Sequence, residues 1–267
     1  MSSAPKIKLY TNHGCPWAHR AHIALIELGL PYEEEIIDLA VPRTEEYLKV
    51  NPRGLVPSLS YDGEIITESA VVAQFLADAH PSHLLPASNS KDGALRRARI
   101  NFFVDAYFSK ANPLIFKVYT AKSPAEVDAV ANSFVEIIAK EVEPLLKDAA
   151  PYFGGSDKPT LAEICSSGLL LPTARSLRRE LSGHMRDANV PIQALTGSFT
   201  LRLFAFSQHE LLPPSLLTSL EKRTPNFYKW AQAVNKTPSV THIWDEETVI
   251  EKTKFRIAKL RGASNGN

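Results

Sequence analysis

The sequence is poor in cysteine and has no surplus of charge. Its two cysteines, Cys15 and Cys165, cannot form the multiple disulfides that stabilise small secreted proteins. A formal net charge of +1 gives no sign of the basic surface that nucleic-acid-binding proteins use, so no nucleic-acid partner is expected. The first residues contain no apolar run of the length that a secretory signal requires. We therefore expect a cytoplasmic protein.

Long apolar stretches are also absent. No uninterrupted run approaches the roughly 18 residues that are needed to cross a bilayer, so no membrane span is expected. The 44% of hydrophobic and 22% of charged residues are ordinary for a globular protein. A chain of 267 residues exceeds the common single-domain size of roughly 100–200 residues, which favours two domains.

The first eighty residues alternate between the two-residue period of strands and the 3.6-residue period of helices. This order predicts an α/β domain in which parallel strands come first and an antiparallel hairpin comes last. The hairpin is centred on Asp62-Gly63, a dipeptide that favours tight hairpin turns. The expected strands are 7–11, 32–39 and two within 56–67, and the expected helices are 16–28, 44–50 and 67–80.

The pattern changes after a stretch of helix breakers at residues 80–93, and helical periodicity dominates from there on. The resulting division is an α/β domain at 5–82, a linker at 83–92, an all-α domain at 93–261 and a disordered tail at 262–267. The expected helices are 93–120, 123–147, 160–182, 214–234 and 245–261, with an irregular insertion at 183–213.

Cys15 lies in the segment NHGCPWAHR, residues 12–20, between a strand and a helix. Pro16 is favoured in the first helical turn, which places Cys15 at the helix N-cap. Backbone N–H groups and the helix dipole favour an anion there, and such placement lowers a thiol pKa from about 8.5 to as little as about 3.5–7.5. A dithiol redox motif would need a second cysteine at position 18, where this chain has Ala18, so any redox chemistry uses a single thiol. A buried structural cysteine is the alternative.

Three histidines, His13, His19 and His22, accompany this cysteine in the sequence. His19 and His22 are three residues apart on the predicted helix, as a pair of metal ligands can be. Zinc requires three or four protein ligands, however, and Cys165 lies far along the chain. We therefore expect no metal and interpret the histidines as packing or solvent-facing residues.

Two further motifs are suited to holding a ligand. If the Val56-Pro57 bond is cis, the backbone of Val56 turns outward and can bind an extended peptide as a neighbouring strand would. Glu68 and Ser69 open the next helix, where Ser69 can cap and favour an anion while Glu68 attracts an ammonium. Each motif also has common structural roles. The capping-box pattern of Thr160 and Glu163 is read as structural.

Taken in order, these motifs resemble those of the cytosolic glutathione S-transferases, over about residues 6 to 260. The segments CPWAHRAHIAL and NPRGLVPSL are most similar to the cysteine-type omega class and its fungal relatives. The resemblance implies a thioredoxin-like N-terminal domain and an all-helical C-terminal domain. It also implies that Cys15 faces the glutathione sulfur, that Val56 pairs with the peptide backbone beside a cis Pro57, that Glu68 and Ser69 hold the γ-glutamyl ammonium and carboxylate, and that Arg43 lies near the glycyl end.

The chain departs from this pattern in three places. Glu163 stands where the family usually has aspartate, which we expect to be tolerated. Arg53 replaces a common aromatic or neutral residue, and its effect is open. The insertion 183–213 has no clear counterpart in compact members, so the shape of the second-substrate pocket is open as well.

The resemblance leaves three functions. Cys15 can exchange thiols through a mixed disulfide, or the site can activate the glutathione thiol for conjugation to an electrophile. In a variant, the thiolate adds reversibly to a conjugated double bond and isomerises it. The segment HGCPWAHRAHIAL is similar to the zeta class, which does such work but carries a serine just before the cysteine, where this chain has Gly14. The third function is a non-catalytic glutathione-binding module.

The second substrate is expected to be a large apolar molecule. Its pocket would include Trp17, Tyr107 and Phe108, although aromatic residues on a helix more often belong to the core. The resemblance further implies a homodimer and allows a role in fungal secondary metabolism.

Overall fold

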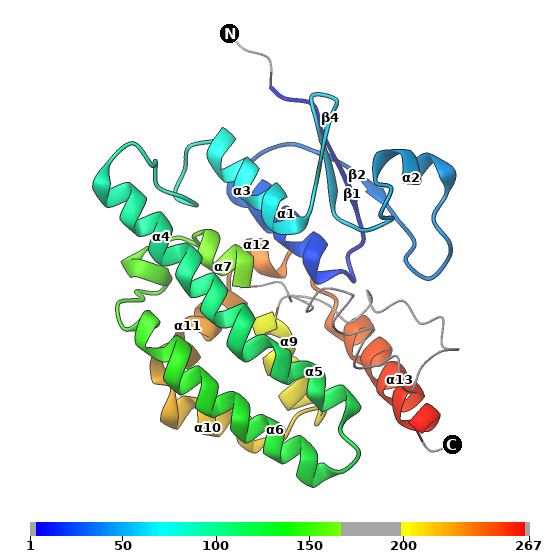
Figure 1. The fold of residues 1–267 in the computed structure, drawn as a ribbon, viewed down its shortest axis with the longest axis vertical. Coiled ribbons are helices and arrows are strands. Elements are labelled where there is room, and N and C mark those ends of the chain that lie inside the picture. The colour runs from blue at the N-terminus through cyan, green and yellow to red at the C-terminus, as the bar shows by residue number, and fades with distance from the viewer. Residues whose placement is uncertain (1–3, 167–198, 265–267) are drawn as a thin grey trace.

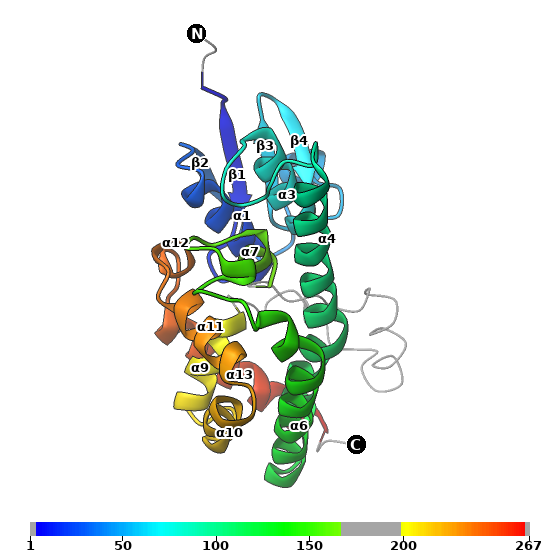
Figure 2. The same cartoon turned by 90° about the vertical axis from the view of Figure 1, so that its left-hand side faces the viewer.

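The computed structural model describes residues 4–166 and 199–264. The strands lie at one end of the molecule with the N-terminus, and an elongated bundle of helices forms the other end (Figure 1). Helix α4 runs from the sheet-containing part far into the bundle, as Figure 2 shows from the side. No helix in the described ranges has the length and apolar character needed to cross a membrane.

The sheet has the strand order β2-β1-β3-β4. As the sequence predicts, β1 and β2 are parallel and β3 pairs antiparallel with β4. Strand β3 also pairs antiparallel with β1, which the sequence did not indicate. Leu9 and Leu59 face each other across β1 and β3, and both are fully buried in the core beneath α1 and α3. The elements of this part are β1 (Ile7–Thr11), α1 (Pro16–Glu27), β2 (Glu33–Ile36), α2 (Glu45–Val50), β3 (Ser58–Tyr61), β4 (Glu64–Thr67) and α3 (Ser69–Ala79).

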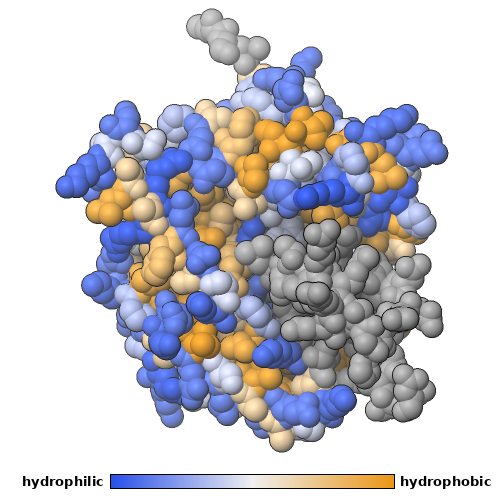
Figure 3. Space-filling view, viewed as in Figure 1, coloured by the Kyte–Doolittle hydropathy of each residue, from blue (hydrophilic) through white to orange (hydrophobic). Residues whose placement is uncertain are grey.

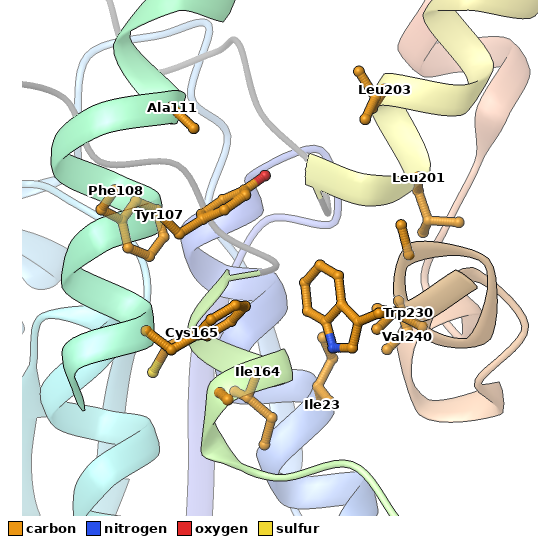
Figure 4. Packing of buried hydrophobic residues seen from close by; sticks show 14 of the residues in the cluster. Ile23, Tyr107, Phe108, Ala111, Ile164, Cys165, Leu201, Leu203, Trp230 and Val240 are labelled. Atoms are coloured by element: carbon orange, nitrogen blue, oxygen red, sulfur yellow. The ribbon is translucent and has the colours of Figure 1, made fainter. Parts of the chain in front are cut away.

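In the second part, the regular elements that the structure describes are helices and helical turns, joined by loops. Its core is built around Trp230, Tyr107 and Phe103, whose side chains are almost completely buried. Figure 4 shows Trp230 and Tyr107 among neighbouring core residues. Its α-helices are α4 (Lys91–Ala106), α5 (Asn112–Thr120), α6 (Pro124–Ile137), α7 (Leu161–Ser166), α9 (Phe199–Gln208), α10 (Ser215–Arg223), α11 (Pro225–Asn235), α12 (Pro238–Thr241) and α13 (Glu246–Ser264). Short π or 3₁₀ turns are η1 (Tyr107–Ala111), η2 (Ile138–Val142), η3 (Glu143–Leu146) and η4 (Phe153–Gly155).

The predicted helix 93–120 is one helical rod with a change of pitch. It begins earlier than predicted, at Lys91, because the side chain of Ser90 caps it by accepting a hydrogen bond from the N–H of Gly93 at 3.0 Å. The rod then widens into the π-helical turn η1 before Pro113. Proline has no N–H to donate and its ring crowds the preceding turn, so a widened turn at this place relieves the conflict.

The predicted helix 214–234 is wrong, because two helices replace it. Thr224, at φ −140° and ψ 60°, separates α10 from α11, since the residue before a proline is disfavoured in the helical region. The carboxylate of Glu143 accepts the N–H groups of Asn226 and Phe227 at 3.0 and 2.8 Å and thereby caps α11.

Three further boundaries differ from the sequence predictions. Strand β2 is shorter than 32–39, and α13 runs to Ser264, so residues 262–264 are helical rather than part of a disordered tail. Helix α7 is described only to Ser166. The remainder of the predicted helix 160–182 lies outside the described residues, and so does the first half of the insertion 183–213. The second half of that insertion contains α9.

Glu163 is a buried anchor of the helical part. Its carboxylate accepts the N–H and hydroxyl of Thr160, both at 2.7 Å, which completes the predicted capping box. It also accepts the N–H of Phe153 at 2.8 Å and the indole N–H of Trp230 at 2.7 Å. These bonds satisfy the buried charge and tie three separate segments together.

Helix α1 joins the two parts of the molecule. It packs against α3 on one side and against α7 and α12 of the helical part on the other. The carboxylate of Glu27 lies 2.9 Å from the ring of His83 and accepts the hydroxyl of Ser239 at 2.5 Å. Because α1 packs against both parts, the structure does not separate them at the predicted linker 83–92, and the division into two domains stays a prediction.

Candidate active site

Cys15 is the N-cap residue of α1, as predicted, with Pro16 at the first helical position. Its N–H donates to the carbonyl of Asn12 at 2.8 Å, which closes the turn between β1 and α1. The side chain of Asn12 steadies the same turn, because it accepts the N–H of Gly14 at 3.0 Å and donates to the carbonyl of Ile37 at 2.9 Å. The thiol is thereby held at the positive end of the helix dipole.

The thiol of Cys15 is nearly buried, with 2% of the residue exposed. It belongs to a small apolar cluster with Ala18, Ile37, Tyr47 and Val56. This burial is consistent with a structural cysteine, whereas the position at the helix N-cap is consistent with a reactive thiol. The sulfur lies 3.8 Å from the carbonyl oxygen of Val56, so two motifs that are 41 residues apart in the sequence meet here.

The Val56-Pro57 peptide bond is cis, as the resemblance implies. The surrounding turn is fixed by two side chains. The hydroxyl of Tyr47 donates to the carbonyl of Leu55, and the amide of Asn51 donates to the same carbonyl at 2.9 Å and to the hydroxyl of Ser58 at 3.1 Å. The backbone that faces Cys15 is therefore rigidly held.

Glu68 and Ser69 open α3, but their roles differ from the prediction. Glu68, not Ser69, is the N-cap residue, and its φ of 71° is uncommon for a residue other than glycine. Ser69 is the first helical residue, and its hydroxyl accepts from the guanidinium of Arg20 instead of capping the helix. A positive φ such as that of Glu68 strains the backbone, and strained backbone often accompanies functional sites. The carboxylate of Glu68 is half-exposed and forms an ion pair with Arg53.

Arg20 was not singled out from the sequence. Its guanidinium is buried and donates to Ser69 at 3.2 Å and to the carbonyl of Cys165 at 2.5 Å. The rings of Trp17 and Phe108 cover it, with centroids 4.9 and 4.8 Å from the guanidinium carbon. Burial lowers the pKa of Arg20 to about 10, which leaves it charged at neutral pH. Its signal in the sequence is a charged residue within a largely apolar helix.

Arg43 is engaged by the backbone of its own loop. It donates to the carbonyl of Gly54 at 3.0 Å and to that of Asp38 at 2.6 Å. Gly54 has a φ of 64°, and an added Cβ would meet the Arg43 side chain at 3.0 Å. Arg43 thus holds the loop before the Val56-Pro57 turn, and its contact with a glycyl carboxylate stays a prediction.

The three aromatic residues predicted for the second-substrate pocket meet around Arg20 or in the core. Tyr107 and Phe108 are 0% and 3% exposed, and burial raises the pKa of Tyr107 well above its usual value. Trp17 is partly buried against the core. A cavity of about 260 Å³ lies elsewhere, between the linker and α4, with His83, Arg99 and Phe153 among its walls. The pocket stays a prediction.

Of the three histidines near Cys15, two stay together, because the ring centroids of His13 and His22 are 5.3 Å apart. His19 faces the helical part, and burial lowers its pKa to about 4 although a hydrogen bond to the backbone of Val240 raises it. Burial also lowers the pKa of His22 to about 3, against the raising effect of Glu34. His13 and His22 both approach Glu34 of β2, a residue that the sequence analysis did not group with them.

Comparison with known proteins gives a consistent result. Residues 14–79 match the family described as "Glutathione S-transferase, N-terminal domain". The chain is 28% identical to glutathione S-transferase omega-1 of Sus scrofa over 151 residues, which is 56% of this chain and 60% of that protein. It is also 28% identical to a probable maleylacetoacetate isomerase of Caenorhabditis elegans over 174 residues, 64% of this chain and 79% of that protein.

Among solved structures, the fold is similar to that of glutathione transferase Omega 2C from Trametes versicolor. The TM-score is 0.69 at 25% sequence identity, and the alignment covers 95% of this chain and 99% of the other. The match with the pig protein spans less than two thirds of that protein's length, whereas the structural match spans almost the whole of both chains.

Proposed function

We propose that this chain, a member of the glutathione S-transferase superfamily with the fold of that superfamily, uses glutathione in a thiol-transfer or conjugation reaction at Cys15. The observation that carries the proposal is the placement of the Cys15 thiol at the N-cap of α1, 3.8 Å from the Val56 carbonyl. A thiol at a helix N-terminus is favoured as thiolate, and a backbone edge beside it suits an extended peptide.

The proposed glutathione site combines four groups. The backbone of Val56 beside cis Pro57 pairs with the cysteinyl part of the peptide. Ser69 and the N-terminus of α3 take the γ-glutamyl carboxylate, and Glu68 takes the ammonium. The buried Arg20 supports this assignment, because it places a positive charge behind Ser69.

In the thiol-transfer reaction, the Cys15 thiolate attacks the glutathione sulfur of a mixed disulfide R–S–S–G. The S–S bond breaks, R–S⁻ leaves and takes up a proton, and Cys15 becomes joined to glutathione. A second glutathione thiolate then attacks the glutathione sulfur on Cys15, which releases oxidised glutathione and restores the Cys15 thiolate. Both steps need only glutathione as reductant.

The isomerase alternative is favoured by one observation. The match with the probable maleylacetoacetate isomerase covers 79% of that protein, more than the 60% for the omega-1 protein. In this reaction, the glutathione thiolate adds to a conjugated double bond, the resulting single bond rotates, and elimination returns glutathione. Cys15 then only stabilises the thiolate. The near-complete burial of Cys15 favours the second alternative, a non-catalytic glutathione-binding module.

The remaining features of the proposal concern the partner molecules. We infer a large apolar second substrate, for which fungal secondary metabolism is one source; of the residues Trp17, Tyr107 and Phe108 predicted for its pocket, Trp17 is partly exposed and the other two are buried. A homodimer is supported by apolar side chains exposed on α3 and α4, which are Val71, Leu95 and Phe102. Figure 3 shows apolar residues over these helices, among hydrophilic ones. We place the protein in the cytoplasm, with no metal needed for the glutathione reaction.

The test is glutathione binding by calorimetry, followed by thiol exchange and isomerisation assays on the wild-type protein and on Cys15→Ala. Loss of exchange in Cys15→Ala with retained binding supports thiol transfer. Retained isomerisation in the same variant supports the isomerase. Binding without any turnover supports the module, and no binding at all contradicts every form of the proposal.

A further inference from the structure

Two histidines and one glutamate converge on the face of the sheet-containing part, beside the turn that carries Cys15. They come from three elements: His13 from the turn after β1, His22 from α1 and Glu34 from β2. One ligand atom of each lies within 4.8 Å of those of the other two. Glu34 presents one oxygen to each ring, at 2.7 Å from Nε2 of His13 and 3.5 Å from Nδ1 of His22.

His22 is held in a fixed orientation. Its side chain is completely buried, and its Nε2 lies 2.7 Å from the hydroxyl of Thr11. The ring therefore turns its Nδ1 towards Glu34 and towards the hydroxyl of Tyr32 at 3.1 Å. An imidazole whose second nitrogen is fixed by a hydrogen bond is the usual arrangement of a metal-binding histidine.

The spacing suits a small divalent cation. Zinc binds imidazole nitrogens and carboxylate oxygens at about 2.0–2.2 Å, so neighbouring ligand atoms of a tetrahedral site lie about 3.4 Å apart. The separation of 3.5 Å between His22 and Glu34 already meets this requirement. The 2.7 Å contact of His13 is with the other oxygen of Glu34, so the His13 nitrogen must move to share the ion, and its half-exposed side chain can rotate to do so.

We propose that His13, His22 and Glu34 bind one Zn²⁺ ion, with water in the fourth position. Two imidazoles and one carboxylate are a ligand set that zinc uses in proteins. The exposed sides of His13 and Glu34 give the ion a path from solvent, whereas the buried His22 supplies the rigid ligand. His13 is two residues from Cys15, so bound zinc would fasten the Cys15 turn to β2 without taking part in the glutathione reaction.

The experiment measures Zn²⁺ binding by competition with a fluorescent chelator, on untagged full-length protein. The variants His13→Gln and Glu34→Gln change side chains that are partly exposed, so folding is retained, and each is checked by circular dichroism. A matched control is His209→Gln, because His209 forms the same kind of surface pair with Glu246, at 3.1 Å, as His13 does with Glu34. A second control, Cys15→Ala, removes the nearby thiol.

The wild-type protein, His209→Gln and Cys15→Ala are expected to bind one zinc ion per chain with equal affinity. His13→Gln and Glu34→Gln should each weaken binding at least tenfold, and Thr11→Val should weaken it about tenfold by releasing the His22 ring. Bound zinc should raise the thermal midpoint of the wild-type protein but not of Glu34→Gln. Absence of stoichiometric binding, or binding by His13→Gln and Glu34→Gln with the affinity of the wild-type protein, overturns the proposal and leaves the cluster as a hydrogen-bonded network.

Discussion

The guanidinium of Arg20 donates a hydrogen bond to the hydroxyl of Ser69 at 3.2 Å, which places a buried cation behind the proposed γ-glutamyl carboxylate site. Among the described residues no carboxylate is paired with Arg20, and its other polar contact is the carbonyl of Cys165. An unpaired buried charge favours an anion nearby. Glutathione binding would supply that anion.

The first prediction follows from this contact. Arg20→Met should weaken glutathione binding about tenfold, because a charge-assisted interaction of about 1.5 kcal/mol is lost. Ser69→Ala should have a similar effect. Calorimetry on the double variant should give a loss smaller than the sum of the two, since both residues act on one carboxylate. Strictly additive losses would contradict this assignment.

Cys15 provides the second prediction. Cys15→Ala should abolish thiol exchange and change the glutathione dissociation constant by less than about threefold, because binding relies on backbone and charged groups rather than on the thiol. Cys165→Ala is the control, since burial raises the pKa of the Cys165 thiol and leaves it unreactive. The measurement is the glutathione-dependent reduction of a mixed disulfide between glutathione and a second thiol. Exchange that persists in Cys15→Ala would falsify the thiol-transfer mechanism.

The ion pair of Glu68 and Arg53 gives a third prediction, with one variant serving as the control of the other. Glu68→Gln should weaken glutathione binding about 10- to 100-fold, since the ammonium loses a charged partner worth about 1.5–3 kcal/mol. Arg53→Gln should change affinity by less than about fivefold, because an exposed pair contributes at most about 1 kcal/mol. Equal losses in the two variants would show that Glu68 does not bind the ammonium.

A fourth prediction concerns pH and His19. Burial lowers its pKa to about 4 in the folded protein, so the unfolded chain, with a pKa near 6.5, binds more protons below neutral pH. The stability that the neutral ring contributes is present above pH 6.5 and is lost as the pH falls towards 4. Between pH 7.5 and 5, His19→Gln should lose about 2 kcal/mol less unfolding free energy than the wild-type protein.

The measurement is urea denaturation at both pH values, with a chelator present so that metal binding does not contribute. The buried His22 remains in both proteins and affects them equally. Parallel pH profiles of the two proteins would show that His19 is not held neutral by burial.

Glu163 supplies the fifth prediction. Glu163→Ala should lower the free energy of unfolding by at least about 3 kcal/mol, because several buried donors, including the indole of Trp230, lose a charged acceptor. Glu163→Asp should retain most of the stability, since the carboxylate is kept. Chemical denaturation followed by tryptophan fluorescence checks both variants. A small effect of the alanine variant would contradict the structural role.

The features that the sequence predicted well have local signals. Pro16 after Cys15 marks a helix start and Asp62-Gly63 marks a hairpin, so the sequence predicts the start of α1 and the antiparallel pairing of β3 with β4. The end of α10 at Thr224 also has a local cause, which is Pro225. The prediction missed it because the helical spacing of apolar residues continues across both helices. The π-helical turn η1 is different, because helical periodicity does not distinguish a widened turn from an ordinary one.

The contacts that sequence reasoning missed join distant residues. Arg20 and Ser69 are 49 residues apart, and no local pattern pairs them. Glu34 could have been grouped with the histidines, since the predicted parallel pairing of the first two strands brings it alongside β1, where it lies opposite Leu9. The side-chain direction that turns it towards His13 and His22 depends on the register of that pairing, which the sequence left undetermined.

The double packing of α1 has a consequence for how this chain could change during evolution. Ile23 of α1 shares a core with Ile164 and Trp230 of the helical part (Figure 4). A recombination event that joined the first eighty residues to another helical half would have to match these contacts and the bonds of Arg20 and Glu27 as well. The two halves are therefore not freely interchangeable modules.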